Sequence, residues 1–248
     1  MERAILQYAF DRSNVPTWEC PNCGSASLSD INNTFASFVR YPIDTDHPNF
    51  EPEWIEYVFT MTLECAVPNC KRIVACCGSG GVEQAFNEDG TPGNGWEDYF
   101  KPKYFQPALN IFIPPENTPH LIKRELSDSF GLFFSSPRAA LNGLRIALEV
   151  LLNELGVPSV NTNGKFIPLD QRIDLLDAKY TVIVAPAKAI KWMGNDGSHA
   201  GTGITSNHVL DAYAIFEHVL DQIYPKGNAT LDNLIAKINA NKGVGSAT

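Results

Sequence analysis

Apolar side chains recur at intervals of three and four residues through the second half of this chain. This spacing places them on one face of an α-helix and predicts a series of amphipathic helices. The clearest helix begins at Ser136 and Pro137, a capping residue followed by a proline suited to the first helical position, and Gly156 ends it. The other predicted helices cover Leu121–Phe134, Asp170–Tyr180, Ala185–Met193 with a start near Pro186, a helix capped by Thr205 or Ser206 that ends at Pro225, and Thr230–Asn239.

The first half of the chain shows alternation instead of helical periodicity. Every second residue between Trp54 and Glu64 is apolar, which is typical of a strand with one buried face. The other predicted segments are strands at Ser37–Tyr41 and Ile73–Cys77, an exposed loop over the glycine-rich Gly78–Asp98, and an extended connector over the proline-rich Lys101–Pro119.

The two patterns together predict an α+β protein, and a length of 248 residues allows two domains. A β domain should occupy residues 1–100 and a proline-rich connector residues 101–120. A helical bundle should follow over residues 121–226, with a short helix and a tail over residues 227–248.

The formal net charge of −9 is concentrated in the first half. Residues up to Leu126 include 9 basic and 17 acidic side chains, whereas the remainder carries 10 and 11. This balance argues against a protein that coats nucleic acid, but it allows a local basic cleft in the helical half. The chain has neither an apolar run of the roughly 18 residues that span a bilayer nor a signal-peptide pattern. We therefore expect a cytoplasmic protein with no membrane association.

The chain holds six cysteines, and four of them form two spaced pairs. The first pair has two residues between its cysteines and the second has four, and paired thiolates of this kind are typical of a zinc ribbon. Because a site of four cysteines leaves no open position, the predicted zinc is structural. Its predicted ligands are Cys20, Cys23, Cys65 and Cys70. Free buried thiols are the alternative, and Cys76 and Cys77 are interpreted as spare thiols or as substitutes in the second pair.

Polar residues interrupt the apolar pattern of the helical half at 191–199. Asn195 and His199 lie four residues apart, as do Arg145 and Glu149 on the leucine-rich helix upstream. Residues four apart share a helix face, so we expect a site between two helices. The structural alternative is a salt bridge within the upstream helix together with a hydrogen-bonded histidine. The residues expected in the core nearby are Trp192 and Met193, and those expected on the surface are His208 and His218.

Several segments of the chain carry a resemblance when they are taken together. They are Tyr104-Phe105-x-Pro107, Arg145–Glu149, Leu169-x-x-Arg172-Ile173, Lys191–His199 and a helix that ends at Tyr224. The chain resembles a bacterial family of unknown function with an N-terminal zinc ribbon and a C-terminal bundle similar to HEPN domains (higher eukaryotes and prokaryotes nucleotide-binding). The resemblance implies a zinc-ribbon-like β domain followed by a HEPN-like helical bundle.

The resemblance also implies that the bundle engages RNA or another nucleic acid. Many such bundles are metal-independent endoribonucleases in antiphage defence or toxin systems. His199 would transfer the proton, Asn195 would position it, and Arg145 would supply the cation. Lys191 is a second candidate for the cation, and Lys191 and Glu149 are candidate binding residues. Gly194 stands where the usual motif has an arginine, so a non-catalytic adaptor that binds a protein partner is the alternative.

The resemblance further implies self-association, because HEPN-like bundles commonly pair. The helices over Leu141–Leu155 and Val209–Ile223 carry more apolar surface than a small bundle is expected to bury alone. We therefore predict a homodimer through the helical bundle.

Overall fold

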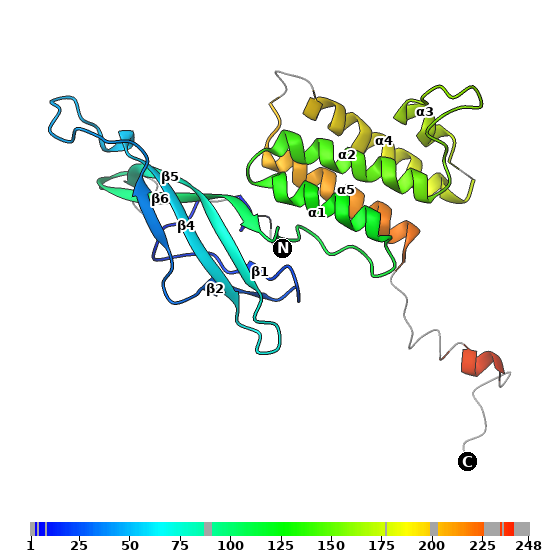
Figure 1. The fold of residues 1–248 in the computed structure, drawn as a ribbon, viewed down its shortest axis with the longest axis horizontal. Helices are drawn as coiled ribbons and strands as arrows, with labels where there is room; N and C mark the ends of the chain where they lie inside the picture. The colour runs from blue at the N-terminus through cyan, green and yellow to red at the C-terminus, as the bar shows by residue number, and fades with distance from the viewer. Residues whose placement is uncertain are drawn as a thin grey trace, which may run out of the picture.

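The computed structural model describes residues 3, 5–7, 9–86, 91–176, 178–198, 203–225, 234 and 236–240. An antiparallel sheet in the first half of the chain is followed by helices, in agreement with the predicted α+β class (Figure 1). We call residues 9–106 the β module and residues 120–223 the helical module. No helix in the described part of the chain is both long enough and apolar enough to cross a membrane.

The described strands form one sheet in the order β1-β2-β4-β5-β6. The remaining strand, β3, pairs with the same edge of β4 as β2 does, along a different part of that strand. Every pairing is antiparallel. The elements are β1 (Trp18–Glu19), β2 (Ala26–Asp30), β3 (Ala36–Val39), the 3-10 turn η1 (Pro52–Trp54), β4 (Glu56–Cys65), β5 (Ile73–Phe86) and β6 (Pro92–Gln106). Strand β4 confirms the strand predicted from the alternating pattern.

The glycine-rich segment forms a long hairpin of β5 and β6. The predicted exposed loop over Gly78–Asp98 is therefore wrong, and residues 101–106, expected in the connector, complete β6. A Cβ atom on Gly78 would lie 2.2 Å from the carbonyl oxygen of Lys101 and 2.7 Å from the ring of Phe59. The glycine thus allows a close approach within the sheet, which a sequence pattern cannot distinguish from a turn.

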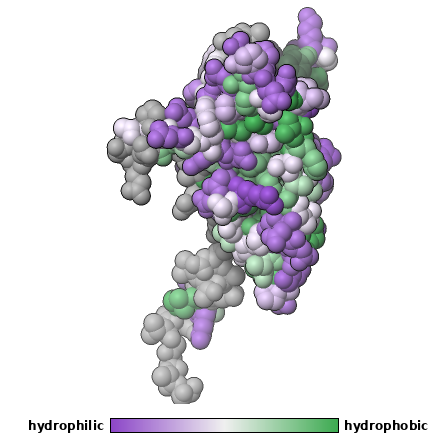
Figure 2. Space-filling model, turned by 90° about the vertical axis from the view of Figure 1, so that its left-hand side faces the viewer, coloured by the Kyte–Doolittle hydropathy of each residue, from purple (hydrophilic) through white to green (hydrophobic). Residues whose placement is uncertain are grey.

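The two faces of the sheet differ in their cover. One face packs an aromatic core in which the rings of Phe59 and Phe100 lie 5.5 Å apart, edge to face. On the other face Phe38 pairs with Val58, and both are exposed, as is Tyr104. Figure 2 views the molecule from the side on which the sheet lies and shows hydrophobic residues gathered among hydrophilic ones.

The helical module contains the predicted helices with shifted ends. They are α1 (His120–Phe133), α2 (Pro137–Glu154), α3 (Leu169–Asp174), the 3-10 turn η2 (Ala178–Tyr180), α4 (Thr181–Ser198) and α5 (Ser206–Ile223). The Ser136 side chain accepts a hydrogen bond from the Ala139 amide, which confirms the predicted cap of α2. Thr205 caps α5 in the same way, through the His208 amide.

Two helix predictions need correction. The helix predicted to start near Pro186 begins at Thr181, so the proline lies inside α4. Its position in the second turn removes one backbone hydrogen bond while the rest of the helix continues to Ser198. The helix predicted over Asp170–Tyr180 is divided into α3 and η2. Of the predicted C-terminal helix, residue 234 and residues 236–240 are helical.

The apolar faces of α2 and α5 pack inside one chain. Leu148 in α2 and Phe216 in α5 are fully buried, and both belong to a single core that all the long helices share. The excess apolar surface that motivated the predicted dimer is therefore not present on these two faces. The homodimer itself stays a prediction.

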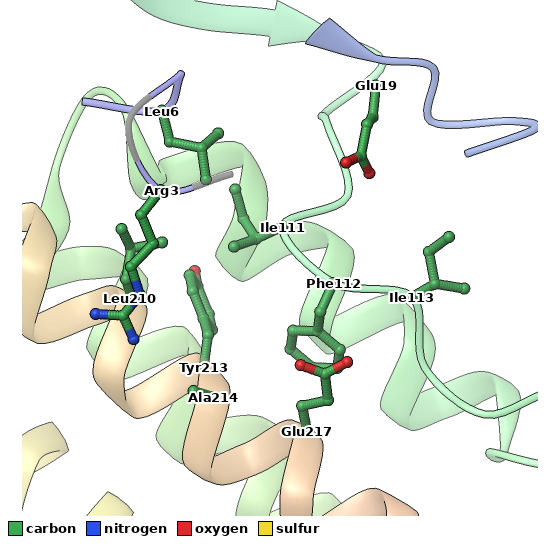
Figure 3. Close-up of a pocket in the computed structure, with 10 residues that line it drawn as sticks. All are labelled: Arg3, Leu6, Glu19, Ile111, Phe112, Ile113, Leu210, Tyr213, Ala214 and Glu217. Atoms are coloured by element: carbon green, nitrogen blue, oxygen red, sulfur yellow. The ribbon is translucent and has the colours of Figure 1, made fainter. Parts of the chain in front are cut away.

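Two segments join the modules. In the N-terminal segment, Leu6 belongs to the helical core while Phe10 belongs to the sheet core. In the connector that follows β6, Leu109 packs in the sheet core and Phe112 packs in the helical core. Figure 3 shows the pocket of about 340 Å³ that Leu6 and Phe112 line together with residues of α5. The modules therefore share a packed junction built from residues outside their regular elements.

Candidate functional site

Four cysteines from two turns of the β module meet at one point. Cys20 and Cys23 follow β1, while Cys65 ends β4 and Cys70 lies in the turn before β5. Their sulfur atoms all lie within 4.8 Å of one another. The Cys20–Cys70 and Cys23–Cys65 sulfur pairs are each 3.6 Å apart. The insertion between the two predicted half-sites therefore folds back and brings them together.

The two turns share a local sequence and a local geometry. Each contains Pro-Asn-Cys and then a residue with positive φ: Gly24 at +73° and Lys71 at +47°. The Gly24 amide donates to the Cys20 carbonyl oxygen at 2.9 Å. This left-handed residue reverses the chain beneath the sulfur atoms. The repeated Pro-Asn-Cys was a further signal in the sequence that paired spacing alone does not use.

Polar groups around the sulfur atoms favour thiolates. The Asn22 side chain donates to the Cys70 sulfur at 3.3 Å, and this hydrogen bond is the main cause that lowers the Cys70 pKa to about 6. The backbone amide and side chain of Ser25 likewise lower the pKa of Cys23. Burial acts in the opposite direction on Cys20 and raises its pKa to about 11. A cation among the sulfur atoms would offset that cost.

The cluster suits a tetrahedral metal ion. Metal–sulfur bonds of about 2.3 Å place the ligand atoms about 3.8 Å apart, close to the observed separations. Cys20 and Cys65 are buried, whereas Cys23 is exposed. Cys76 and Cys77 stand on β5, outside this group, with Cys76 buried in the sheet core. The arrangement is thus a candidate metal centre formed by the four cysteines that the sequence singled out.

A second polar group lies where α2 packs against α4. The Arg145 guanidinium donates to the Asn195 side-chain oxygen at 2.8 Å across the two helices. The same guanidinium lies 3.4 Å from a carboxylate oxygen of Glu149, one turn along α2. Three of the predicted site residues are therefore neighbours. The salt bridge of the structural alternative is also present.

Gly194 has a packing role at this crossing. A Cβ atom on Gly194 would lie 2.9 Å from the Arg145 Cβ and 3.2 Å from its Cδ. The glycine therefore allows α4 to approach the stem of Arg145. An arginine side chain could not occupy the same position, so the glycine has a packing reason here.

Lys191 lies one turn before Asn195 on α4, and its side chain reaches Asp170 of α3. Its ammonium is 3.2 Å from an Asp170 carboxylate oxygen and 3.2 Å from the centroid of the Trp192 ring. The lysine is almost fully buried, whereas Trp192 is 57% exposed, so the expected core position of Trp192 is wrong. Met193 packs against the helical core as expected. His208 and His218 are exposed, as expected.

Arg172, which the sequence analysis named only within a resembling segment and gave no role, is the most buried cation of the helical module among the described residues. It is 2% exposed and donates to the Asn153 side chain at 2.7 Å and to the Val157 carbonyl oxygen at 3.0 Å. Burial lowers its pKa, and the charge of Glu149 opposes that shift. These contacts fasten α3 to the end of α2, a role that single-sequence spacing does not reveal.

His199, the predicted proton-transfer residue, lies outside the described residues. Asn195, four residues earlier in the sequence, lies on α4. The described part of the helical site therefore consists of a paired arginine, its amide partner and a paired lysine.

Comparison with known families divides the chain at the same place as the structure. The model of one domain of unknown function (DUF8608) matches residues 8–105, and that of another (DUF4145) matches residues 127–241. No curated protein and no solved structure matches the chain. Its two modules are thus each similar to a domain whose function is unknown.

Proposed function

We propose that this protein is a non-catalytic binding protein in which a zinc-held β module and a helical module together present a surface to a protein partner. In this proposal the β module is a zinc-ribbon-like unit, and zinc is its structural ion. The helical module is HEPN-like in fold without cleaving RNA.

One observation carries the proposal. The two cations predicted to contact RNA already have partners. Arg145 is held by Glu149 and by Asn195, whereas Lys191 is held by Asp170. An arginine that neutralises a phosphorane must present its fork to the substrate. Releasing Arg145 would break both an ion pair and a hydrogen bond between helices. These contacts suit a structural role for Arg145, in which it holds α2 and α4 together.

A second candidate is a metal-independent endoribonuclease. The hydrogen bond between Arg145 and Asn195 favours it, because it joins two predicted catalytic residues, and Asn195 precedes His199 by four residues in the sequence. His199 would then transfer the proton, Asn195 would position it and Arg145 would supply the cation. RNA products would end in a 2′,3′-cyclic phosphate.

Incubation of the purified protein with total cellular RNA separates the two proposals. The binding-protein proposal expects no cleavage by the wild type, with or without magnesium. The nuclease proposal expects cleavage that survives chelator and falls about a hundredfold in His199→Ala, the usual scale for losing a general acid or base. Asp221→Ala, on the last turn of α5, is the matched control. Cleavage with that dependence would overturn the binding-protein proposal.

A further inference from the structure

A groove separates the first cysteine turn from helix α1. It has a volume of about 790 Å³ and is open to the surface at Ile113, which is 56% exposed. Its apolar lining also includes Pro114, Leu126 and Phe130. A volume of this size accommodates several side chains.

The C-terminal segment carries a matching apolar stripe. Its sequence places Leu231, Leu234, Ile235 and Ile238 at intervals of three and four. Residue 234 and residues 236–240 are helical, with Leu234 50% and Ile238 39% exposed. Figure 1 draws this short helix apart from both modules. A helix of about ten residues is marginal in water without a packing surface.

The segment leaves the helical module at the end where the groove lies. The start of α5, at Ser206, lines one small pocket together with Phe133 and Phe134 at the end of α1. The two helices are therefore antiparallel, and α5 ends beside the first half of α1, which forms one wall of the groove. From Pro225 to residue 234 the chain can extend about 30 Å, enough to bring the segment back.

Two further observations favour this chain's own segment as the occupant. The family model for the helical half continues to residue 241, beyond the end of α5, so the segment belongs to the recurring module. The segment and the groove also each carry one acidic and one basic side chain. Asp232 and Lys237 flank the apolar stripe, while Lys123 and Glu116 line the groove.

We propose that the helical residues 234 and 236–240 bind in this groove, with Leu234 and Ile238 against Ile113 and the connector. The bound segment would cover the connector beside Pro21 and Asn22 of the first cysteine turn. This inference does not depend on the proposed function.

Hydrogen exchange on the full chain tests the proposal. Exchange of the amides of residues 111–127 is compared between the wild type, a Leu234→Asp/Ile238→Asp variant and an Asn233→Asp/Asn239→Asp control that changes the polar side of the segment. We expect about tenfold faster exchange in the first variant, the scale of losing a modest local contact, and no change in the control. Equal exchange in all three proteins would overturn the proposal.

The reciprocal variant and the mass of the protein complete the test. Ile113→Asp should expose residues 231–240 to exchange, and combining it with the segment variant should add nothing further. Helical circular dichroism and metal content verify that each variant remains folded. Protection that depends on protein concentration, together with a dimer mass by light scattering, would show that a second copy supplies the segment and would contradict binding within one chain.

Discussion

The helical module buries a continuous, mainly aliphatic core, whereas the β module has a smaller, aromatic-rich core that includes Cys20 and Cys65 of the four-cysteine cluster. Helices satisfy their own backbone hydrogen bonds and require only an apolar stripe to pack. A sheet with one exposed face and long glycine-rich strands buries less per residue. From this comparison we expect burial to stabilise the helical module, whereas the β module would gain stability from an ion bound at the cysteines.

The junction differs from both modules. Its packing residues Leu6, Ile111 and Phe112 lie outside the two family matches. The Phe105 and Phe134 rings, 4.9 Å apart, add a contact between the last strand and the residue that ends α1. The pairing of the modules thus rests both on residues outside the two matched ranges and on Phe105 and Phe134 within them.

Removing the metal ion should produce the largest difference in stability between the two modules. Structural zinc sites contribute roughly 10–16 kcal/mol of apparent binding free energy, comparable to the whole stability of a domain. Cys65→Ser, or chelation of the wild type, should therefore unfold the β module while the helical circular dichroism signal remains. Limited proteolysis with mass analysis would show cuts within residues 9–106 and a protected helical fragment.

Cys77→Ser is the matched control, because Cys77 lies on the same sheet outside the cluster. It should retain about one equivalent of zinc by elemental analysis and resist proteolysis as the wild type does. Wild-type protein that stays resistant after complete chelation would contradict the role of the ion.

The sequence predicted the helical module better than the sheet for a physical reason. A period of three and four residues is local, so α1 and α2 and their ends can be derived from it. The strands β5 and β6 depend on partners far along the chain, and their glycines serve close approaches that involve Phe59 and Lys101. The cysteine pairs were predictable since ligand spacing is local, but their meeting required the fold of the strands between them.

The helical polar group was predicted only in part. The four-residue spacing found Arg145 and Glu149, and the contact with Asn195 follows from the packing of α2 on α4. The same spacing could not show that Gly194 makes room for the arginine stem. Nor could it show that Arg172 is buried, because both facts arise from contacts between segments.

Within the helical module, a large core truncation should have the next largest effect. Leu148→Ala removes a fully buried side chain and should cost about 2–5 kcal/mol of unfolding free energy. Ile146→Ala, at a position on α2 that is 42% exposed, is the control and should cost much less. Urea unfolding followed by circular dichroism measures both. Zinc content unchanged in Leu148→Ala would support separate stabilisation of the two modules, and its loss would argue against it.

Gly194→Ala tests the crossing of α2 and α4. The added methyl group would meet the Arg145 stem at 2.9 Å, so the helices must separate, at a cost of about 1–3 kcal/mol. Gly203→Ala, where no atom lies within 4 Å of the added Cβ, should be close to neutral. Thermal unfolding provides the measurement. A stabilised Gly194→Ala would mean that helix propensity outweighs packing here and that the close approach is not required.

The smallest expected effect is the coupling between Arg145 and Asn195. A hydrogen bond to a charged donor at a partly exposed site should contribute about 1 kcal/mol, reduced by solvent and by the competing Glu149. A double-mutant cycle with Arg145→Ala and Asn195→Ala, measured by urea unfolding, isolates this energy. A second cycle, which combines Arg145→Ala with Asp196→Ala at the neighbouring residue of α4, serves as the control. If the first cycle gave no coupling, the structural role of Arg145 would lose its support, and the nuclease proposal, in which Arg145 must turn toward RNA, would gain from the same result.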